Sequence, residues 1–384
     1  MIHIGYFSNQ FASTSGHGIA RYANHLYNAL LQNKAALKLH PVSASTNGTK
    51  EELNALKLRT GLQVLPWGRK VTPLAWIFFN FPFLENGITN QIDIVHALSL
   101  GYKVATLKPY VVTIHDIGPL THPQYFTKKD QWFMKGSLKQ AVKKAAAMIC
   151  VSQATADAVE DYALANYNTS VKERLHVVHE GVDATFFKAP NVEEITDYHI
   201  VKSLLNTSFV LTVGQISPRK NLQTVLRAFN KLKDKLPNLQ LITVGGNGWD
   251  YDKVKEQVKV LGLENRVHFL GYVSDDLLRF LYRKAVVFVY PSLFEGFGLT
   301  VLEAMASSCP VITSNTTSLP EIAGDAAILI NPEDVEKLSN NISLVCNNKK
   351  IREQMITKGL QRAKTFTWKR AADLTFDLYK NISL

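Results

Sequence analysis

Two glutamates separated by seven residues are the side chains best suited to chemistry in this chain of 384 residues. Glu295 lies on a glycine-flanked turn after an apolar run that ends at Tyr290, and Glu303 lies inside the helix expected to follow. Carboxylates accept hydrogen bonds from paired hydroxyls, whereas the N–H groups and the dipole of a helix N-terminus favour a phosphate. The spacing therefore predicts a site for a ligand with both hydroxyls and phosphate, such as a nucleotide sugar.

A structural role is the alternative for both glutamates, with Glu295 as a turn residue and Glu303 on a helix surface. Glu295 stands between a strand end and the glycines of Glu295-Gly296-Phe297-Gly298, where packing alone does not call for a carboxylate. The residues around Glu303, from 301 to 306, are mostly apolar, so its charge needs a partner. Both settings favour ligand binding.

Two adjacent cations, Arg219 and Lys220, follow another strand-like run and precede a helix. Arginine offers forked donors and lysine a point charge, a pair that suits a diphosphate. Cations at a helix start oppose the helix dipole unless an anion lies between them. We therefore expect these residues to bind an anion rather than to form a solvated charge pair.

Two further signals are weaker. His115 and Asp116 end the apolar run from 110, where doubly wound folds place their sites, although a hydrogen-bonded structural histidine and a capping aspartate fit equally well. Gly16 and Gly18 precede a helix and let a ligand approach the backbone, but any tight strand-to-helix turn needs small residues.

Short apolar runs alternate with longer amphipathic stretches, which predicts an α/β protein with parallel sheets. Expected strands are 2–7, 37–44, 93–98, 110–117, 148–152, 209–214, 239–245, 267–271, 286–290, 311–314 and 327–330. Expected helices are about 18–32, 127–146, 153–164, 221–235, 252–261, 275–283, 299–307, 333–346 and 350–364. The length fits two domains, and the connector at 179–187 marks their boundary. We expect two doubly wound, Rossmann-like domains facing across a cleft, with domain 1 at 1–185 and domain 2 at 186–365.

A net charge of +11 implies an anionic partner. Lys135, Lys139 and Lys143 recur every fourth residue and form a basic stripe on the helix expected at 127–146. Together with Trp132 and the aromatic run 76–83, this stripe suggests a surface for anionic lipid. A solvated helix face and a buried aromatic core explain the same residues. A nucleic-acid-binding protein is the rival from another class, but we expect no nucleic acid because no interleaved aromatic–basic motif is present.

The first ten residues lack the basic start and long apolar run of a secretory signal, and the longest apolar run, 74–84, is too short to span a bilayer. We therefore expect a cytoplasmic location. The sequence leaves open whether the protein also has peripheral contact with the inner face of the membrane. The three cysteines have no metal-ligand spacing, and no residue set predicts a metal site.

The chain resembles the retaining glycosyltransferases of family 4, which have the two-domain GT-B fold, along nearly its whole length. The resemblance rests on Val213-Gly214, on Pro218-Arg219-Lys220-Asn221-Leu222, and on the run from Pro291-Ser292 to Glu303-Ala304-Met305. Pro310-Val311-Ile312 and the run from Ser314-Asn315 to Leu319-Pro320-Glu321-Ile322 continue it. The mannosyltransferase-like members are the most similar.

The resemblance implies roles for individual residues. Domain 2 would be the donor domain, and domain 1 would be the acceptor side. A C-terminal helix at 366–384 would return to pack on domain 1. Arg219 and Lys220 would hold the donor pyrophosphate, and Glu303 the ribose. Glu295 and His115 would lie near the transferred sugar. The remaining donor-binding residues would be Gly16, Gly18, Gly214, the backbone near Tyr272 and Val273, and the N–H groups of Phe297, Gly298 and Leu299.

The implied activity is transfer of a hexosyl group, with retention, from a nucleoside diphosphate sugar to a hydroxyl of a glycan or lipid-linked glycan. Mannosyl transfer from GDP-mannose is favoured, and transfer of a glucosyl, N-acetylglucosaminyl or galactosyl group from a UDP-sugar is the alternative. A GT-B nucleotide-sugar epimerase is a further alternative. No cofactor or metal is implied, because two cations and a helix dipole replace the metal. Ala20 and Gln215 depart from the family pattern, which places more weight on Arg219 and Lys220.

Overall fold

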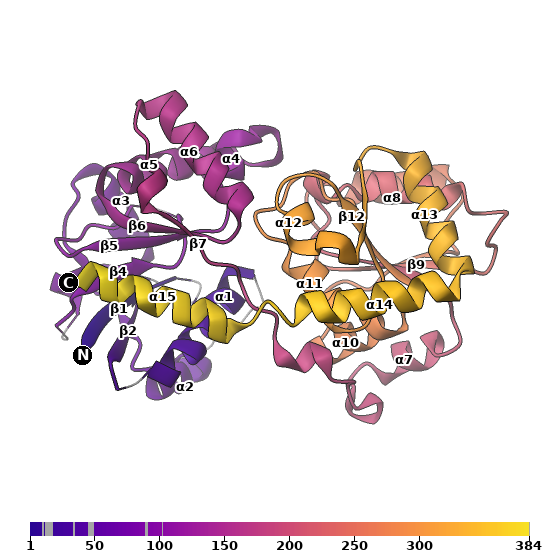
Figure 1. Cartoon of the computed structure of the whole chain (residues 1–384), viewed down its shortest axis with the longest axis horizontal. Helices are drawn as coiled ribbons and strands as arrows, with labels where there is room; N and C mark the ends of the chain where they lie inside the picture. Colours follow the sequence, from indigo (N-terminus) through magenta and orange to yellow (C-terminus); the bar gives the residue numbers. More distant parts are fainter. Residues whose placement is uncertain are drawn as a thin grey trace. The chain divides into compact units, whose positions relative to one another are not determined.

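The computed structural model describes residues 1–9, 11, 18–33, 35–44, 50–88, 91–101 and 103–383. The chain divides into two compact units (Figure 1). Unit 1 comprises Met1–Gly181 together with Trp368–Leu384, and unit 2 comprises Val182–Thr367. The boundaries expected from the sequence are 185 and 365.

Unit 1 is built on a parallel sheet whose strand order, in the described part, is β3-β2-β1-β4-β5-β6-β7. Its strands are β1 Ile2–Phe7, β2 Leu37–Ser43, β3 Gln63–Val64, β4 Ile94–Ala97, β5 Tyr110–Ile114, β6 Ala145–Cys150 and β7 Leu175–Val177. Its α-helices are α1 Gly18–Leu30, α2 Lys50–Thr60, α3 Gly68–Phe78, α4 Gly118–Thr121, α5 Lys128–Lys144, α6 Gln153–Tyr167 and α15 Trp368–Ser383.

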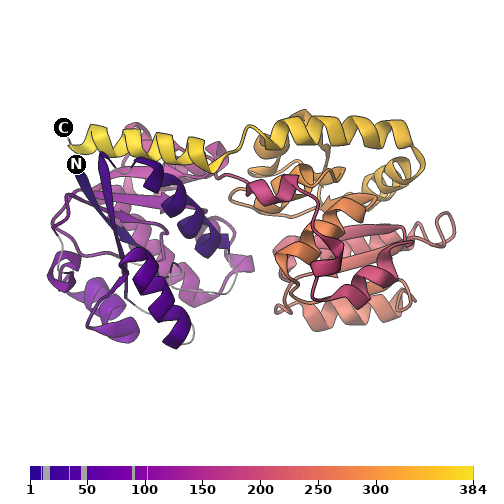
Figure 2. The ribbon, with the colours of Figure 1, turned by 90° about the horizontal axis from the view of Figure 1, so that it is seen from below.

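Two hydrophobic cores cover the two faces of this sheet. Tyr6 and Phe7 are neighbours on β1 but belong to different cores, because successive side chains of a strand point to opposite faces. Trp76 of α3 is fully buried in the core that contains Phe7. The final helix α15 packs beside α1 and contributes Tyr379 to the other core (Figure 2). The last helix of the chain thus completes unit 1.

Unit 2 repeats the architecture with the strand order β10-β9-β8-β11-β12-β13. Its strands are β8 Phe209–Val213, β9 Gln240–Val244, β10 Val267–Phe269, β11 Val287–Tyr290, β12 Val311–Ser314 and β13 Ile328–Ile330. Its α-helices are α7 Tyr198–Leu204, α8 Leu222–Asn230, α9 Tyr251–Val260, α10 Asp275–Lys284, α11 Leu299–Ala306, α12 Leu319–Ala323, α13 Val335–Asn347 and α14 Lys349–Ala363. All described strand pairs in both sheets are parallel.

Each sheet has a point where the direction of strand addition reverses. In unit 1 this point lies between β1 and β4, and in unit 2 it lies between β8 and β11. Ligands of doubly wound folds bind at the carboxyl ends of the strands beside such a point. Arg219 and Lys220 follow β8, and Glu295 follows β11, so the topology of unit 2 brings the three residues to its reversal point.

Candidate functional site

The centre of the candidate site is an ion cluster between the loops that follow β8 and β11. Oε1 of Glu295 lies 2.9 Å from Nη1 of Arg219 and 2.6 Å from Nζ of Lys220. Arg219 Nη1 also donates to the carbonyl of Phe294, at 3.2 Å. The glutamate side chain is 10% exposed and the arginine side chain 30% exposed, so the guanidinium is reached from solvent while its counter-ion is covered.

Two hydroxyl groups complete the shell around the same oxygen. Tyr290 donates to Oε1 of Glu295 at 2.8 Å, and Ser292 donates to it at 2.6 Å. Lys220 donates to the hydroxyl of Tyr290, and its Nζ lies 4.6 Å from the centroid of the tyrosine ring. Within the described residues, every donor that meets this carboxylate meets Oε1. The other oxygen, Oε2, is therefore the one positioned to accept a hydrogen bond from a ligand.

The charges in this cluster determine the pKa of Glu295. Burial alone would raise the pKa of the carboxyl, but the charges of Arg219 and Lys220, with hydrogen bonds from Lys220 and Ser292, lower the pKa to about 2. Such a group is ionised at neutral pH and is a weak base. Glu295 therefore suits the acceptance of hydroxyl hydrogen bonds and does not suit general acid–base catalysis.

The backbone that carries the cations is held by glycine and asparagine. Gly214 has φ +145°, and a Cβ at this position would lie 3.3 Å from Cε of Lys220, so the glycine gives room to the lysine stem. Asn221 is left-handed (φ +57°) and donates to the carbonyls of Pro291 at 3.1 Å and Pro332 at 2.7 Å. The loops that follow β8, β11 and β13 are thus joined at the site.

The turn from Glu295 into α11 is held by the loop after β12. Thr317 accepts a hydrogen bond from the amide of Glu295 at 3.1 Å, and Ser318 donates to the carbonyls of Glu295 and Phe297 at 3.0 and 2.7 Å. Gly298 is the N-cap residue of α11, with φ +112°, and among the described residues it makes no side-chain capping hydrogen bond. The N-terminus of a helix carries partial positive charge and N–H donors, which suit an anion.

Glu303 occupies a separate position on α11. It is 4% exposed, and its Oε2 accepts a hydrogen bond from the hydroxyl of Tyr282 on α10 at 3.4 Å. The sequence predicts a partner for the charge of Glu303, and the hydroxyl of Tyr282 is one such partner. The structure places the two glutamates in different surroundings, one among cations and one beside a phenol.

A glycine-rich loop after β9 packs against the loop that carries the cations, and the sequence analysis did not single it out. A Cβ on Gly245 would lie 2.2 Å from the carbonyl oxygen of Gly214, and a Cβ on Gly248 would lie 2.0 Å from that of Ile216. The amide of Gly245 donates to the carbonyl of Gly271 at 2.8 Å. The run Gly245-Gly246-Asn247-Gly248 directly after an apolar strand was the available signal.

Two of the residues expected to bind the donor, Tyr272 and Val273, follow β10. Tyr272 is mostly exposed and Val273 is buried, so the chain turns inward between them.

In unit 1, His115 follows β5, and each of its ring nitrogens faces a hydrogen-bond acceptor. Nδ1 lies 3.1 Å from Oε1 of Glu180, and Nε2 lies 3.0 Å from the carbonyl oxygen of Leu98. The ring of Tyr22 packs edge-on against it at a centroid distance of 4.7 Å. Burial would lower the pKa of His115, but Glu180, the carbonyl of Leu98 and Asp116 together raise it. Two acceptors facing two ring nitrogens fit the doubly protonated, cationic imidazole.

Glu180 is a second residue that the sequence analysis passed over as part of the connector. It is buried, and it stands next to Gly181, the last residue of the first segment of unit 1. Gly18 begins α1, and no atom of the described residues lies within 4 Å of the position that a Cβ would take there. Gly16 lies outside the described residues. Across the part of the chain described, no group of three or more His, Cys, Asp or Glu could hold a metal ion.

Family models match both units of the chain. The model for Glycosyltransferase Family 4 matches residues 16–186, and the model for glycosyl transferases group 1 matches residues 194–362. Each match lies largely within one compact unit, and the second contains Arg219, Lys220, Glu295 and Glu303.

Relatives of known name and solved structures agree with these matches. The chain is 33% identical over 280 residues to O-antigen chain mannosyltransferase B of Escherichia coli, covering 73% of this chain and 72% of that one. It is 28% identical over 271 residues to O-antigen chain mannosyltransferase RfbU of Salmonella typhimurium, covering 69% of each. HepE of Anabaena, solved with UDP and glucose, shares the fold with a TM-score of 0.74 at 18% identity, covering 99% of this chain and 100% of that one. The predicted GT-B architecture is confirmed, and the chain belongs to the family 4 glycosyltransferases.

Proposed function

We propose that this glycosyltransferase moves a mannosyl group from GDP-mannose to a hydroxyl of a glycan or lipid-linked glycan, with retention of the anomeric configuration. The observation that carries the proposal is the cluster of Arg219, Lys220 and Glu295 at the carboxyl ends of β8 and β11, with Glu295 in the turn that leads into α11. The choice of mannose follows the names of the two O-antigen mannosyltransferases to which the chain is similar.

The donor diphosphate would bind Arg219 and Lys220. Both cations already meet one carboxylate oxygen, which shows that their donors converge on an anion at this place. The N-terminus of α11 adds N–H groups and the positive end of a helix dipole. These protein groups are the ones that would meet the charge of a diphosphate, and the proposal includes no cofactor and no metal.

The two glutamates would bind different hydroxyl groups of the donor. Glu295 keeps Oε1 for its four protein donors and offers Oε2 to a hydroxyl of the transferred sugar. Glu303 would accept from the ribose hydroxyls, with Tyr282 exchanging its hydrogen bond when the nucleotide arrives. A carboxylate-bound hydroxyl is a charge-assisted hydrogen bond, which is stronger than one between neutral groups.

The chemistry follows from where charge develops. As the glycosidic bond breaks, the leaving diphosphate gains negative charge, and fixed cations stabilise that state more than the bound substrate. Inversion needs a general base that activates the acceptor hydroxyl. Glu295 is a weak base, and His115 has acceptors at both ring nitrogens. These properties favour a route in which the departing diphosphate takes the proton, which gives retention.

A donor screen followed by product analysis tests the proposal. GDP, GDP-mannose, UDP and UDP-sugars are compared by thermal shift, because a ligand that binds the folded state raises its apparent stability. GDP-mannose is then incubated with a panel of hexoside acceptors, and the anomeric configuration of the product is read by NMR. A shift with GDP and GDP-mannose and an α-linked mannoside support the proposal.

Other results overturn particular parts of it. Stabilisation and transfer with UDP-sugars alone contradict the choice of GDP-mannose. A β-linked mannoside contradicts retention. A donor isomer formed without acceptor identifies an epimerase instead.

A further inference from the structure

Helix α3 of unit 1 presents apolar side chains to solvent on one face. Val71, Leu74 and Phe78 follow the spacing i, i+3, i+7, which aligns them on one side of the helix, and each is more than half exposed. Thr72 and Trp76 lie on the opposite side and are fully buried. The helix therefore anchors itself in the core with one face and leaves a second apolar face exposed to solvent.

The exposed apolar surface continues past the end of α3. Phe79 is 79% exposed and Phe81 is 55% exposed, whereas Phe83 packs against the core. Single exposed apolar residues are ordinary, but five exposed apolar side chains within residues 71–81 are typical of a surface that binds something.

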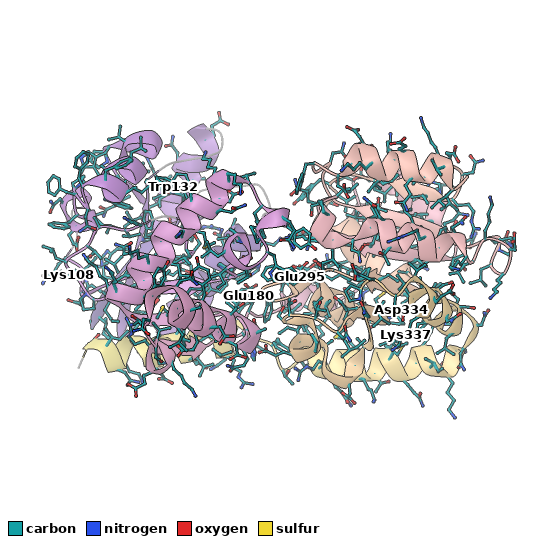
Figure 3. The ribbon with its side chains drawn as sticks, turned by 90° about the horizontal axis from the view of Figure 1, so that it is seen from above. Lys108, Trp132, Glu180, Glu295, Asp334 and Lys337 are labelled. Atoms are coloured by element: carbon teal, nitrogen blue, oxygen red, sulfur yellow. The ribbon has the colours of Figure 1, made fainter. Side chains whose placement is uncertain are left out.

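Helix α5 places positive charge beside this apolar surface. Lys103 donates to the carbonyl of Ile77 at 3.2 Å, and its stem passes Gly136 of α5, which joins the end of α3 to the middle of α5. A shallow pocket of about 210 Å³ lies here, and its lining includes Ile77, Trp132 and Lys139. Trp132, 52% exposed, projects from α5 (Figure 3).

Positive charge predominates on α5. The helix carries six lysines, at positions 128, 129, 135, 139, 143 and 144, and one acidic residue, Asp130. Asp130 is used in the capping box with Thr127 at the helix start. The side chains of Arg69 and Lys70 on α3 lie outside the described residues.

We propose that this surface binds a membrane that contains anionic lipid. It comprises Val71, Leu74, Phe78, Phe79, Phe81 and Trp132 with the lysines of α5, and we call it the aromatic–basic surface. Apolar side chains would enter the acyl boundary, Trp132 would lie at the headgroup level, and the lysines would meet lipid phosphates. A second copy of the chain fits less well, because two such lysine-rich helices would repel each other.

No spanning segment accompanies this surface. Of the helices in the described parts of the chain, none is both long enough and apolar enough to cross a bilayer. The contact would thus be peripheral, and it would depend on both components because neither a few apolar side chains nor a few charges alone gives stable anchoring.

Co-sedimentation with vesicles tests the proposal without donor or acceptor, so its failure is separate from failure of the proposed activity. The wild-type protein should bind phosphatidylcholine vesicles that contain phosphatidylglycerol, bind pure phosphatidylcholine weakly, and be released by high salt. The double variant Lys135→Gln/Lys139→Gln should bind anionic vesicles roughly tenfold to thirtyfold more weakly. Phe79→Ser/Phe81→Ser should weaken binding at least about tenfold.

Matched controls use exposed residues of unit 2. Trp249→Ser replaces an exposed aromatic residue, and Lys349→Gln/Lys350→Gln removes two neighbouring exposed lysines of α14. Both variants should bind vesicles like the wild type. Circular dichroism and the midpoint of thermal unfolding should show that every variant is folded.

Three results would overturn the proposal. The first is wild-type vesicle binding by both aromatic–basic variants. The second is binding of oligonucleotides but not vesicles, with the lysine variant losing it, which would identify a nucleic-acid surface. The third is self-association in sedimentation experiments that Phe79→Ser/Phe81→Ser abolishes, which would identify a second copy as the occupant.

Discussion

At the scale of single residues, the candidate site depends on one oxygen atom with four donors. Oε1 of Glu295 gathers Arg219, Lys220, Tyr290 and Ser292 within 2.9 Å. The carboxylate thereby fixes the direction of both cations before any ligand arrives. Removing the carboxylate would lower the stability of the protein, because two positive charges would then face each other in a covered site without their counter-ion.

We predict that Glu295→Gln destabilises the protein by about 3 kcal/mol near neutral pH. The pKa of Glu295 falls from an ordinary 4.5 to about 2 on folding, so its stabilisation is complete above about pH 4.5 and is lost as the pH falls through about 2. Urea denaturation should show a large difference between wild type and variant near neutral pH and a shrinking difference below pH 4.5. The exposed Glu256→Gln should show neither effect.

The pair of His115 and Glu180 gives a prediction of opposite sign. The pKa of His115 is raised in the folded protein, so its contribution to stability is complete below about pH 6.5, the ordinary value for histidine, and is lost as the pH rises through the raised pKa. Glu180→Gln removes the negative charge at Nδ1, and the pKa should fall. An NMR titration of the His115 ring measures this directly. An unchanged pKa in the variant would contradict the ion pair.

At the scale of elements, the C-terminal helix α15 is fastened to unit 1 by a buried polar chain. The hydroxyl of Tyr379 lies 2.5 Å from Nδ1 of His96, Nε2 of His96 lies 2.9 Å from Oγ1 of Thr113, and Thr113 lies 3.1 Å from the hydroxyl of Tyr22. Burial, with a smaller effect of His115, lowers the pKa of His96 to about 3, so this histidine is neutral. This series of hydrogen bonds connects the helices α15 and α1 with the strands β4 and β5.

We predict that Tyr379→Phe destabilises unit 1 by about 1–3 kcal/mol, because it leaves a buried ring nitrogen of His96 without its partner. The apolar ring is retained, so packing is nearly unchanged. Urea denaturation of the variant should be compared with Tyr198→Phe, which removes a hydroxyl from an exposed residue. Equal stability of the two variants would show that the hydroxyl of Tyr379 contributes nothing.

The elements that surround the site were largely predictable, because their strands are continuous apolar runs. Strand β11 ends at Tyr290 as expected, and α10 extends one residue beyond the expected 275–283. Helix α3 was not predicted. It contains Pro73 and carries apolar residues on both faces, with Trp76 inward and Phe78 outward, so no single stripe stands out. Strands β3 and β7, of two and three residues, are too short to give a pattern.

The partners of the site residues were less predictable than the residues themselves. Arg219 and Glu295 are 76 positions apart, and their contact follows only from the pairing of β8 with β11. Glu180 lies 65 positions from His115, in a segment whose pattern indicates only a connector. Charge pairs between distant strand ends depend on sheet order, which local patterns do not specify.

At the scale of the whole molecule, the residues proposed to bind the diphosphate and the ribose all lie in unit 2, whereas the aromatic–basic surface lies in unit 1. Chain order supports this division, because α15 returns to unit 1 and leaves residues 182–367 as one uninterrupted segment. The two proposals therefore concern different units. Variants of the aromatic–basic surface should leave the thermal shift caused by the nucleotide unchanged.

In the proposed reaction, Arg219 and Lys220 stabilise the leaving diphosphate of the donor. The most direct measurement is the rate of GDP release from saturating GDP-mannose by wild type and by Arg219→Ala, with exposed Arg370→Ala as the control. We expect Arg219→Ala to lower kcat at least about tenfold and also to weaken donor binding, because the lost charge acts in the transition state as well as in the bound state. A wild-type kcat in Arg219→Ala would contradict this expectation.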